Sequence, residues 1–375
     1  MRVLHFINSF GVGGAETQLL RTIPLIQRNK WEHIVVALRP PITLQGAFVK
    51  QGIPTHLLLS TRPNPLTQLV KGVAALIRLV RVERPAVLHT ALFPANIIAR
   101  IVGRLIGVPV VEHLVNILYD PLWLLEPQIK PYKFAAQHRL DRATSHCVRR
   151  FIAISDAVKE SAVNELAVSS AQVTVIPYGI FPEEWVMPDE RNTKSEQLVT
   201  IGRLVALKGH RYLLKAMSKV IATFPKVRLF IVGDGPLHLE LERMIQQLGL
   251  EKQVFLMGSK APKEIKSLLW NACVFVFPSL SEGRGVALLE AMASGLASVA
   301  SAIPTVKEID PEGKAILLVT PGDFESLAEG ICCLLASPQK REVMGKHAQN
   351  IVWEHFDLRK LAPRWIEVYE QVLSS

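Results

Sequence analysis

Residues 274–295, VFVFPSLSEGRGVALLEAMASG, contain the pattern that decides the fold. The four consecutive apolar residues 274–277 predict a strand that is buried on both faces. A loop with two glycines follows, and a helix is expected to begin near Gly285. A buried strand, a glycine-rich loop and a helix in this order are the repeating unit of a parallel α/β sheet.

Twelve further short apolar runs alternate with helical patterns on both sides of this unit. In the first half the predicted strands are 3–7, 34–38, 55–59, 86–88, 108–111, 151–154 and 173–176. In the second half they are 198–201, 227–232, 254–256, 274–277, 297–300 and 316–319. The predicted fold class is therefore α/β, with two doubly wound, Rossmann-like domains whose ligands bind beyond the carboxyl ends of the strands.

The length of 375 residues also favours two domains. Residues 181–197 are rich in proline and charge and have no clean period, so we expect the interdomain linker there. We place the first domain at residues 1–182 and the second at residues 183–357. The last stretch, from about residue 357 to residue 372, has the spacing of an amphipathic helix.

Two carboxylates flank the glycines of the 274–295 stretch. Glu282 precedes Gly283 and Gly285, and Glu290 follows them more than one helical turn later. Backbone N–H groups at the start of the helix can meet an anionic or hydroxylated ligand, and the two acids can then address different parts of it. The alternatives are a capping residue for Glu282 and an exposed helix acid for Glu290, and residue type alone leaves them open.

A second glycine-rich loop, residues 11–16 (GVGGAE), separates the first predicted strand from its helix. It suits close approach of a ligand to the backbone, although a plain tight turn would use the same residues. The dinucleotide pattern G-x-G-x-x-G is incomplete, because Glu16 occupies the third glycine position. The next predicted strand ends in Arg39 rather than in a ribose-binding acid, which disfavours NAD and leaves NADP open.

Several segments in order resemble the motifs of glycosyltransferase family 4, a retaining, metal-independent family with the GT-B fold. Residues 282–295 (EGRGVALLEAMASG) resemble its E-x7-E motif, and Gly202-Arg203-Leu204 with Lys208-Gly209 resembles its GRL…KG segment. Residues 232–236 (VGDGP) resemble its GDGP strand end, residues 255–258 (FLMG) its FLG turn, and Gly13-Gly14 its first-domain loop. The resemblance spans essentially the whole chain and is stronger in the second half.

The resemblance implies a role for each matching residue. Arg203 and Lys208 would neutralise the charge that grows on the departing diphosphate, which a transferase without a metal ion must do with fixed cations. Glu282 would contact hydroxyls of the donor sugar, and His113, at the end of a first-domain strand, resembles the histidine that reaches the same sugar. These four residues form the implied catalytic set.

Donor binding and acceptor binding are implied in the same way. Glu290 would bind the ribose diol, since a carboxylate accepts two hydroxyl hydrogen bonds. Glu16 would orient the acceptor, although acids are also common at helix starts. The implied donor-binding residues are Gly13, Gly14, Gly233, Gly235, Gly258, Gly283, Arg284, Gly285 and Glu290.

Two positions depart from the family pattern. Arg284 stands where the family often has an aromatic residue, and Tyr178-Gly179-Ile180-Phe181 stands where it usually has NG-x-D. Both lie near the expected cleft. The resemblance therefore leaves the donor nucleobase, the sugar and the acceptor open.

The implied function is transfer of a sugar from a UDP-, GDP- or ADP-sugar to a glycan or lipid-linked saccharide, in cell-envelope or exopolysaccharide synthesis. The nucleotide sugar is a co-substrate, and we expect no cofactor and no metal ion. The first domain would bind the acceptor and the second the donor, with residues 358–375 crossing back onto the first. An epimerase of the same fold that acts on a nucleotide sugar, and an inactive donor-binding partner subunit, are the alternatives.

Charge is divided unequally between the halves. Residues 1–182 contain 20 Lys/Arg and 10 Asp/Glu, whereas residues 183–375 contain 23 of each. This asymmetry suits an anionic membrane surface or an acidic ligand, or it aids solubility, and no nucleic-acid-binding module accompanies it. Basic helices are predicted at residues 67–84 and 138–150.

The length of the apolar runs and the spacing of the cysteines bear on where the protein is located. No apolar run approaches the length that spans a bilayer, and the four cysteines lack the spacing of a metal or disulfide framework. We therefore expect a cytoplasmic protein with free thiols that docks on the inner face of the cell membrane.

Overall fold

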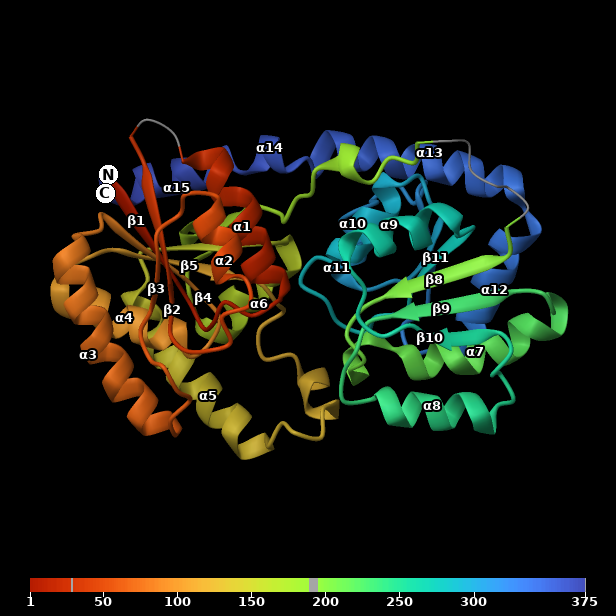
Figure 1. The fold of residues 1–375 in the computed structure, drawn as a ribbon, viewed down its shortest axis with the longest axis horizontal. Coiled ribbons are helices and arrows are strands. Elements are labelled where there is room, and N and C mark those ends of the chain that lie inside the picture. The colour runs from red at the N-terminus through yellow and green to blue at the C-terminus, as the bar shows by residue number, and fades with distance from the viewer. Residues whose placement is uncertain (28–29, 189–194, 375) are drawn as a thin grey trace. The chain divides into compact units, whose positions relative to one another are not determined.

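The computed structural model describes residues 1–27, 30–188 and 195–374, so residues 189–194 of the predicted linker lie outside the described residues. Internal contacts divide the chain into two compact units. The first consists of Met1–Tyr119, Pro131–Gly179 and Leu358–Ser375, and the second of Asp120–Lys130 and Ile180–Asp357. Figure 1 shows the sheet and the surrounding helices of each unit.

The first unit contains a seven-stranded parallel sheet in the order β3-β2-β1-β4-β5-β6-β7. Its strands are β1 (Arg2–Ile7), β2 (Glu32–Ala37), β3 (Thr55–Leu57), β4 (Val87–Ala91), β5 (Val110–Leu114), β6 (Arg150–Ala153) and β7 (Val173–Val175). Its helices are α1 (Gly14–Ile26), α2 (Gln45–Lys50), α3 (Pro65–Glu83), α4 (Ala95–Ile106), α5 (Pro131–Thr144) and α6 (Asp156–Leu166), with short 3-10 turns η2 (Ser145–Cys147) and η3 (Ser170–Gln172).

The second unit contains a six-stranded parallel sheet in the order β10-β9-β8-β11-β12-β13. Its strands are β8 (Gln197–Ile201), β9 (Arg228–Val232), β10 (Val254–Leu256), β11 (Val274–Phe277), β12 (Ser298–Ser301) and β13 (Ile316–Val319). Its helices are α7 (His210–Thr223), α8 (His238–Gln247), α9 (Pro262–Asn271), α10 (Val286–Ala293), α11 (Pro304–Lys307), α12 (Phe324–Ala336) and α13 (Pro338–His355). The 3-10 turns are η1 (Pro121–Leu125), η4 (Pro182–Glu184) and η5 (Ala206–Lys208).

The predicted fold class is confirmed, and each of the thirteen predicted apolar runs overlaps a strand. The inner strands of both sheets are largely buried on two faces, as the near-continuous apolar runs indicate, whereas the edge strands β3, β7, β10 and β13 are only partly buried. Two strands continue further than their apolar runs. β4 continues through His89 and Thr90, and β5 through Glu112 and His113. His89, Thr90 and Glu112 are buried with hydrogen-bond partners of their own, whereas His113 is buried against the rings of Tyr178 and Trp365.

The predicted C-terminal helix is present but interrupted. It forms as α14 (Leu358–Leu361) and α15 (Pro363–Ser374), since Pro363 cannot donate the backbone hydrogen bond that would join them. α15 belongs to the first unit, where Tyr369 hydrogen-bonds His89 at 2.6 Å. Among the described residues, no helix is both long and apolar enough to cross a membrane.

Candidate active site

Three loops at the carboxyl edge of the second sheet carry most of the predicted site residues. Residues 202–209 follow β8, residues 233–236 follow β9, and residues 278–285 follow β11. β8 lies between β9 and β11, and the strand order reverses between β8 and β11. Because parallel strands end at the same edge, the loops meet at the reversal point, which is where doubly wound sheets bind ligands.

Lys208 and Glu282 meet across this reversal point. The Lys208 ammonium donates to Oε1 of Glu282, and the hydroxyl of Ser279 donates to the same oxygen at 2.8 Å. The ammonium also lies 5.9 Å from the centre of the Phe277 ring. With 22% and 11% of their side chains exposed, the two charges are partly screened from water but reachable from it. Two predicted catalytic residues are therefore in direct contact.

Arg203 and Arg284 differ in what their guanidinium groups do. Arg203 is exposed beyond β8, and within the described residues its side chain has no hydrogen bond or ion pair. Arg284 is 4% exposed, forms an ion pair with Glu308 at 3.3 Å and lies 5.6 Å from the Phe356 ring. The charge of Arg284 is thus buried and paired with Glu308, whereas that of Arg203 faces solvent.

The glycines at the ends of β8 to β10 allow the loops to pack against one another. Gly233 has φ +134°, and a Cβ there would lie 2.0 Å from the carbonyl oxygen of Gly202. Gly233 also donates its N–H to the carbonyl of Gly258 at 2.9 Å. A Cβ on Gly235 would lie 2.6 Å from the carbonyl oxygen of Leu204. These predicted donor-binding glycines are therefore required for backbone packing, whatever ligand they meet.

The loop after β11 leads into α10 as predicted. Gly285 precedes the helix with φ +79°, a left-handed conformation that glycine adopts without strain. Gly283 is buried in the loop, and Glu290 lies half-buried on the second turn of the helix. Glu282 and Glu290 are thus placed before and within one helix, in the order that the sequence predicts.

The glycine-rich loop of the first unit is closed by its own acid. Gly13 precedes α1, and a Cβ there would lie 2.4 Å from Oε2 of Glu16. Glu16 is 7% exposed, and its carboxyl group hydrogen-bonds its own backbone N–H, while burial raises its pKa. A Cβ on Gly14 would meet nothing within 4 Å. Gly14 is therefore the open side of this loop.

His113 is buried at the end of β5, with 3% of its surface exposed. Its ring lies 4.9 Å from Trp365 and 5.3 Å from Tyr178, and these residues and Thr90 line a cavity of about 20 Å³, enough for one water molecule. Burial lowers the pKa of His113 to about 3, so the imidazole is neutral at pH 7. Its Nε2 has no hydrogen-bond partner within the described residues.

Sequence reasoning missed Ser279 and Asp120. Ser279 holds the carboxylate of Glu282, and its position between a buried strand and Glu282 was the available signal. Asp120 accepts a hydrogen bond from Ser281 at 2.6 Å, although it comes from the first half of the sequence, where nothing marked it. Within the part of the chain that the structure describes, no three His, Cys, Asp or Glu side chains are grouped to hold a metal ion.

Two family models match the chain one after the other. "Glycosyl transferase 4-like domain" matches residues 13–179, and "Glycosyl transferases group 1" matches residues 183–351. Together they account for both units apart from short terminal stretches.

Two curated relatives are informative. The "MMP alpha-(1->4)-mannosyltransferase" of Mycolicibacterium hassiacum is 28% identical over 256 residues, 67% of this chain and 61% of that protein. The "UDP-Gal:alpha-D-GlcNAc-diphosphoundecaprenol alpha-1,3-galactosyltransferase" of Escherichia coli is 26% identical over 313 residues, 80% of this chain and 79% of that protein. The match thus spans less than two thirds of the length of the first relative.

Solved structures share the fold over the full chain. HepE of Anabaena, in complex with UDP and glucose, gives a TM-score of 0.84 at 22% identity, covering 99% of this chain and 100% of that one. Sucrose-phosphate synthase of Thermosynechococcus elongatus gives 0.82 at 20% identity, with both chains fully covered.

Proposed function

The chain belongs to the group 1 glycosyltransferases, family 4, with the GT-B fold, and on that premise we propose that it transfers a sugar from a UDP-sugar with retention of configuration. The observation that carries the proposal is the contact between Lys208 and Glu282 at the reversal point of the second sheet. This is where a doubly wound sheet holds a nucleotide, and the pair supplies both a cation and a hydroxyl acceptor there.

The residues at this edge suit the charge changes of the reaction. As the bond to the sugar breaks, negative charge grows on the diphosphate, and Lys208 and the exposed Arg203 can stabilise it. Glu282 accepts hydrogen bonds from sugar hydroxyls when the Lys208 ammonium turns to the phosphate. The departing phosphate oxygen then accepts the proton of the attacking acceptor hydroxyl, so no separate base is needed.

Each unit receives one substrate in this proposal. The second, at about residues 183–357, binds the donor with Glu290 on the ribose. The first, residues 1–182 with the terminal helix, binds the acceptor beside Glu16 and supplies His113 to the sugar. The E. coli relative is named for UDP-galactose and a diphosphoundecaprenol-linked acceptor, which supports UDP as the nucleotide and a lipid-linked saccharide as the acceptor.

Nucleotide binding tests the donor half of the proposal. Thermal unfolding is measured with UDP-, GDP- and ADP-sugars, and a UDP-sugar at 100 times its dissociation constant should stabilise the protein by about 2.7 kcal/mol. Glu290→Ala should weaken UDP binding in calorimetry by roughly 1.5–3 kcal/mol, through loss of charged hydrogen bonds. Glu329→Ala, which removes an exposed glutamate of α12, is the matched control. Equal UDP affinity in both variants would contradict the role of Glu290.

Turnover tests the reaction itself. UDP-glucose or UDP-galactose is incubated with octyl-linked N-acetylglucosamine, and UDP should appear only when the acceptor is present. An isomerised nucleotide sugar formed without acceptor would instead identify an epimerase.

Docking of the first unit on an anionic membrane forms part of the proposal. α3 carries Lys71, Arg78 and Arg81 on its exposed side, together with the exposed Leu66 and Val70. Each basic residue near an anionic leaflet contributes on the order of 1 kcal/mol, so three or four acting together give reversible attachment. A lipid-linked acceptor would then be presented at the surface where the enzyme lies.

Vesicle co-sedimentation checks this docking. Binding should require anionic lipid, weaken from low to physiological salt because of screening, and fall when Arg78, Arg81, Arg149 and Arg150 are replaced by Gln. Replacing Arg228 and Lys252, two exposed cations of the second unit, by Gln is the matched control. Equal partitioning onto neutral and anionic vesicles, or onto neither, would show that the basic half serves another purpose.

A further inference from the structure

Residues 120–130, hereafter the 120–130 segment, belong to the second unit although the chain before and after them belongs to the first. The segment contains the 3-10 turn η1, which packs against η5, the turn that carries Lys208. Eleven residues of the first half of the sequence are thus built into the unit that carries the candidate active site.

Two acids of the segment bind the residues that precede Glu282 and Lys208. Ser281 donates its hydroxyl to Oδ2 of Asp120 at 2.6 Å, and Oδ1 of Asp120 accepts the N–H of Leu122 at 2.9 Å. Further along, Glu126 is 2% exposed and accepts the backbone N–H of Leu207 at 3.4 Å. Each acid therefore holds the immediate neighbour of one member of the Lys208–Glu282 pair.

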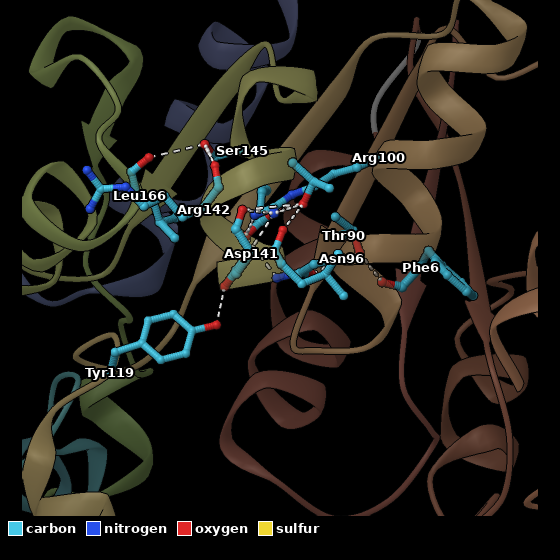
Figure 2. Close-up of polar contacts among 12 residues, drawn as sticks. Phe6, Thr90, Asn96, Arg100, Tyr119, Asp141, Arg142, Ser145 and Leu166 are labelled. Carbon is cyan, nitrogen blue, oxygen red and sulfur yellow. Dashed lines mark hydrogen bonds and ion pairs between the residues drawn. The ribbon is translucent and has the colours of Figure 1, made fainter. Parts of the chain in front are cut away.

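The segment is tethered where it leaves the first unit. Tyr119 adopts φ +53°, a conformation rare for a non-glycine residue, so its surroundings must hold it there. Its hydroxyl donates to Oδ2 of Asp141 at 2.7 Å (Figure 2). Its ring stacks on His138, with 4.3 Å between the ring centres. Tyr119, the residue just before the segment, is therefore held within the first unit by contacts of its own side chain.

Asp141 is in turn part of a buried charge network. Arg100, fully buried, pairs with Oδ1 of Asp141 at 2.6 Å and makes two hydrogen bonds to Glu112, at 2.8 and 2.9 Å (Figure 2). Asn96 adds a third hydrogen bond to Glu112 at 2.9 Å. Burial raises the pKa of Glu112, while the Arg100 guanidinium acts in the opposite direction. Tyr119 is thus attached, through Asp141, to a buried network of charged side chains in the first unit.

We propose that the 120–130 segment positions the catalytic pair, with Asp120 acting through Ser281 on Glu282 and Glu126 acting through Leu207 on Lys208. This inference rests on the proposed function of that pair. Displacing a catalytic group by about 1 Å through a distant change can cost on the order of a hundredfold in rate. Loss of the Asp120 contact, which acts on Glu282, should therefore slow turnover while leaving nucleotide affinity, which the proposed function assigns to Glu290, Arg203 and Lys208, nearly unchanged.

A double-mutant cycle tests Asp120. Asp120→Ala and Ser281→Ala should each lower kcat for UDP-glucose by about tenfold, and the double variant should lose no more than either single one, because both remove the same contact. Ser281→Thr retains the hydroxyl and should retain kcat. UDP affinity in calorimetry should stay within about threefold of the unaltered protein in all four.

Asp323→Ala is the matched control for loss of a cap. Asp323 caps α12 in the same unit, as Asp120 caps η1, and accepts hydrogen bonds from Glu325 and Ser326. It should lower the midpoint of thermal unfolding without changing kcat. A purely structural Asp120 would behave as Asp323 does, and equal kcat in Asp120→Ala and the unaltered protein would overturn the inference.

Two further measurements test the inference in other ways. The first uses a substitution outside the candidate active site, and the second measures hydrogen exchange and needs no turnover. Tyr119→Phe removes only the hydrogen bond to Asp141 and should lower kcat by a few fold. In Asp120→Ala, backbone amides of residues 203–209 and 279–285 should exchange hydrogen faster, whereas those of α12 should not. Unchanged exchange in both loops would also overturn the inference. Failure of the unaltered protein to bind any nucleotide sugar would count against the proposed function alone, since the exchange result stands without it.

Discussion

At the residue scale, the proposed roles of Lys208 and Glu282 concern two neighbouring groups of the nucleotide sugar, its diphosphate and its sugar. The two side chains are in contact with each other. The ammonium is shared between the Glu282 carboxylate and any phosphate that reaches it. A diphosphate carries more charge than one carboxylate, so it should draw the ammonium away and leave Glu282, still held by Ser279, to accept hydrogen bonds from the sugar.

Lys208→Ala should therefore lower kcat by about 10² to 10³, the usual effect of removing one preorganised donor from a developing charge. Lys219→Ala is the control, because Lys219 forms an exposed ion pair with Glu325 in the same unit and should change kcat little. Steady-state kinetics with UDP-glucose make the comparison. A loss within about threefold for Lys208→Ala would contradict a role in stabilising the diphosphate.

The family resemblance placed Lys208 and Glu282 in one set, and the structure brings them into contact because both follow strands that lie side by side in the second sheet. The sequence did not predict the ion pair between Arg284 and Glu308, because Glu308 lies at the end of another helix, α11. The sequence also did not predict the role of Asp120, since its contact with Ser281 depends on where the 120–130 segment packs. Motif spacing is local, whereas these two contacts are set by tertiary placement.

At the element scale, glycines decide how closely the loops after neighbouring strands approach. Gly209 and Gly249 have nearly the same left-handed φ, +69° and +67°. A Cβ on Gly209 would lie 2.0 Å from the carbonyl oxygen of Pro278, just after β11, whereas one on Gly249 would meet nothing within 4 Å. An alanine would therefore suffer the same backbone strain at either position, and only at Gly209 would its methyl group also clash with a neighbouring loop.

Gly249→Ala should cost about 1–2 kcal/mol of unfolding free energy, the strain of a left-handed alanine. Gly209→Ala should cost more, and it should also weaken UDP binding, because the β8 and β11 loops must separate. Urea unfolding and calorimetry measure the two effects. Similar losses in both variants, with UDP affinity intact, would mean that the loops accommodate the methyl group and that their close packing is dispensable.

The elements themselves were largely predictable, since each of the thirteen apolar runs overlaps a strand among the described residues. What the runs did not predict was the extension of β4 and β5 through His89 and Glu112, where polar side chains replace apolar ones. Those residues are buried because they satisfy one another and residues distant in sequence, such as Tyr369 and Arg100. Such pairing has no periodic signature.

At the scale of the whole molecule, the first unit contains a run of histidines across four adjacent strands. His5, His33, His89 and His113 are each at most 3% exposed. His5 and His33 share a hydrogen bond of 2.9 Å, and the His89 and His113 rings stack at 5.5 Å. Burial lowers the pKa of all four, to about 4 for His33 and about 3 for His113.

This cluster should make the protein sensitive to acid. Well above pH 6.5 the histidines are neutral whether folded or unfolded, and they add little pH dependence. Below it the unfolded chain binds protons that the folded chain excludes, so stability falls as the pH drops toward 4, by about 1.4 kcal/mol per pH unit for each histidine. Burial also lowers the pKa of His210 in the second unit, which adds to the trend, whereas it raises the pKa of Glu16 and Glu112, which opposes the trend.

Urea unfolding of the protein at pH 7.5, 6.5 and 5.5 measures that slope. The free energy of unfolding should fall between the first two values and fall about three times as much between the last two, because the unfolded histidines become protonated mostly below pH 6.5. His33→Leu removes one buried histidine, one whose Nε2 has no partner in the described part of the chain, and should reduce the slope by about one proton. His146→Gln, at an exposed position, should leave the slope as it is. If the free energy of unfolding stayed constant or rose below pH 6.5, the cluster would have to accept protons while folded, and the lowered pKa of His113 would be contradicted.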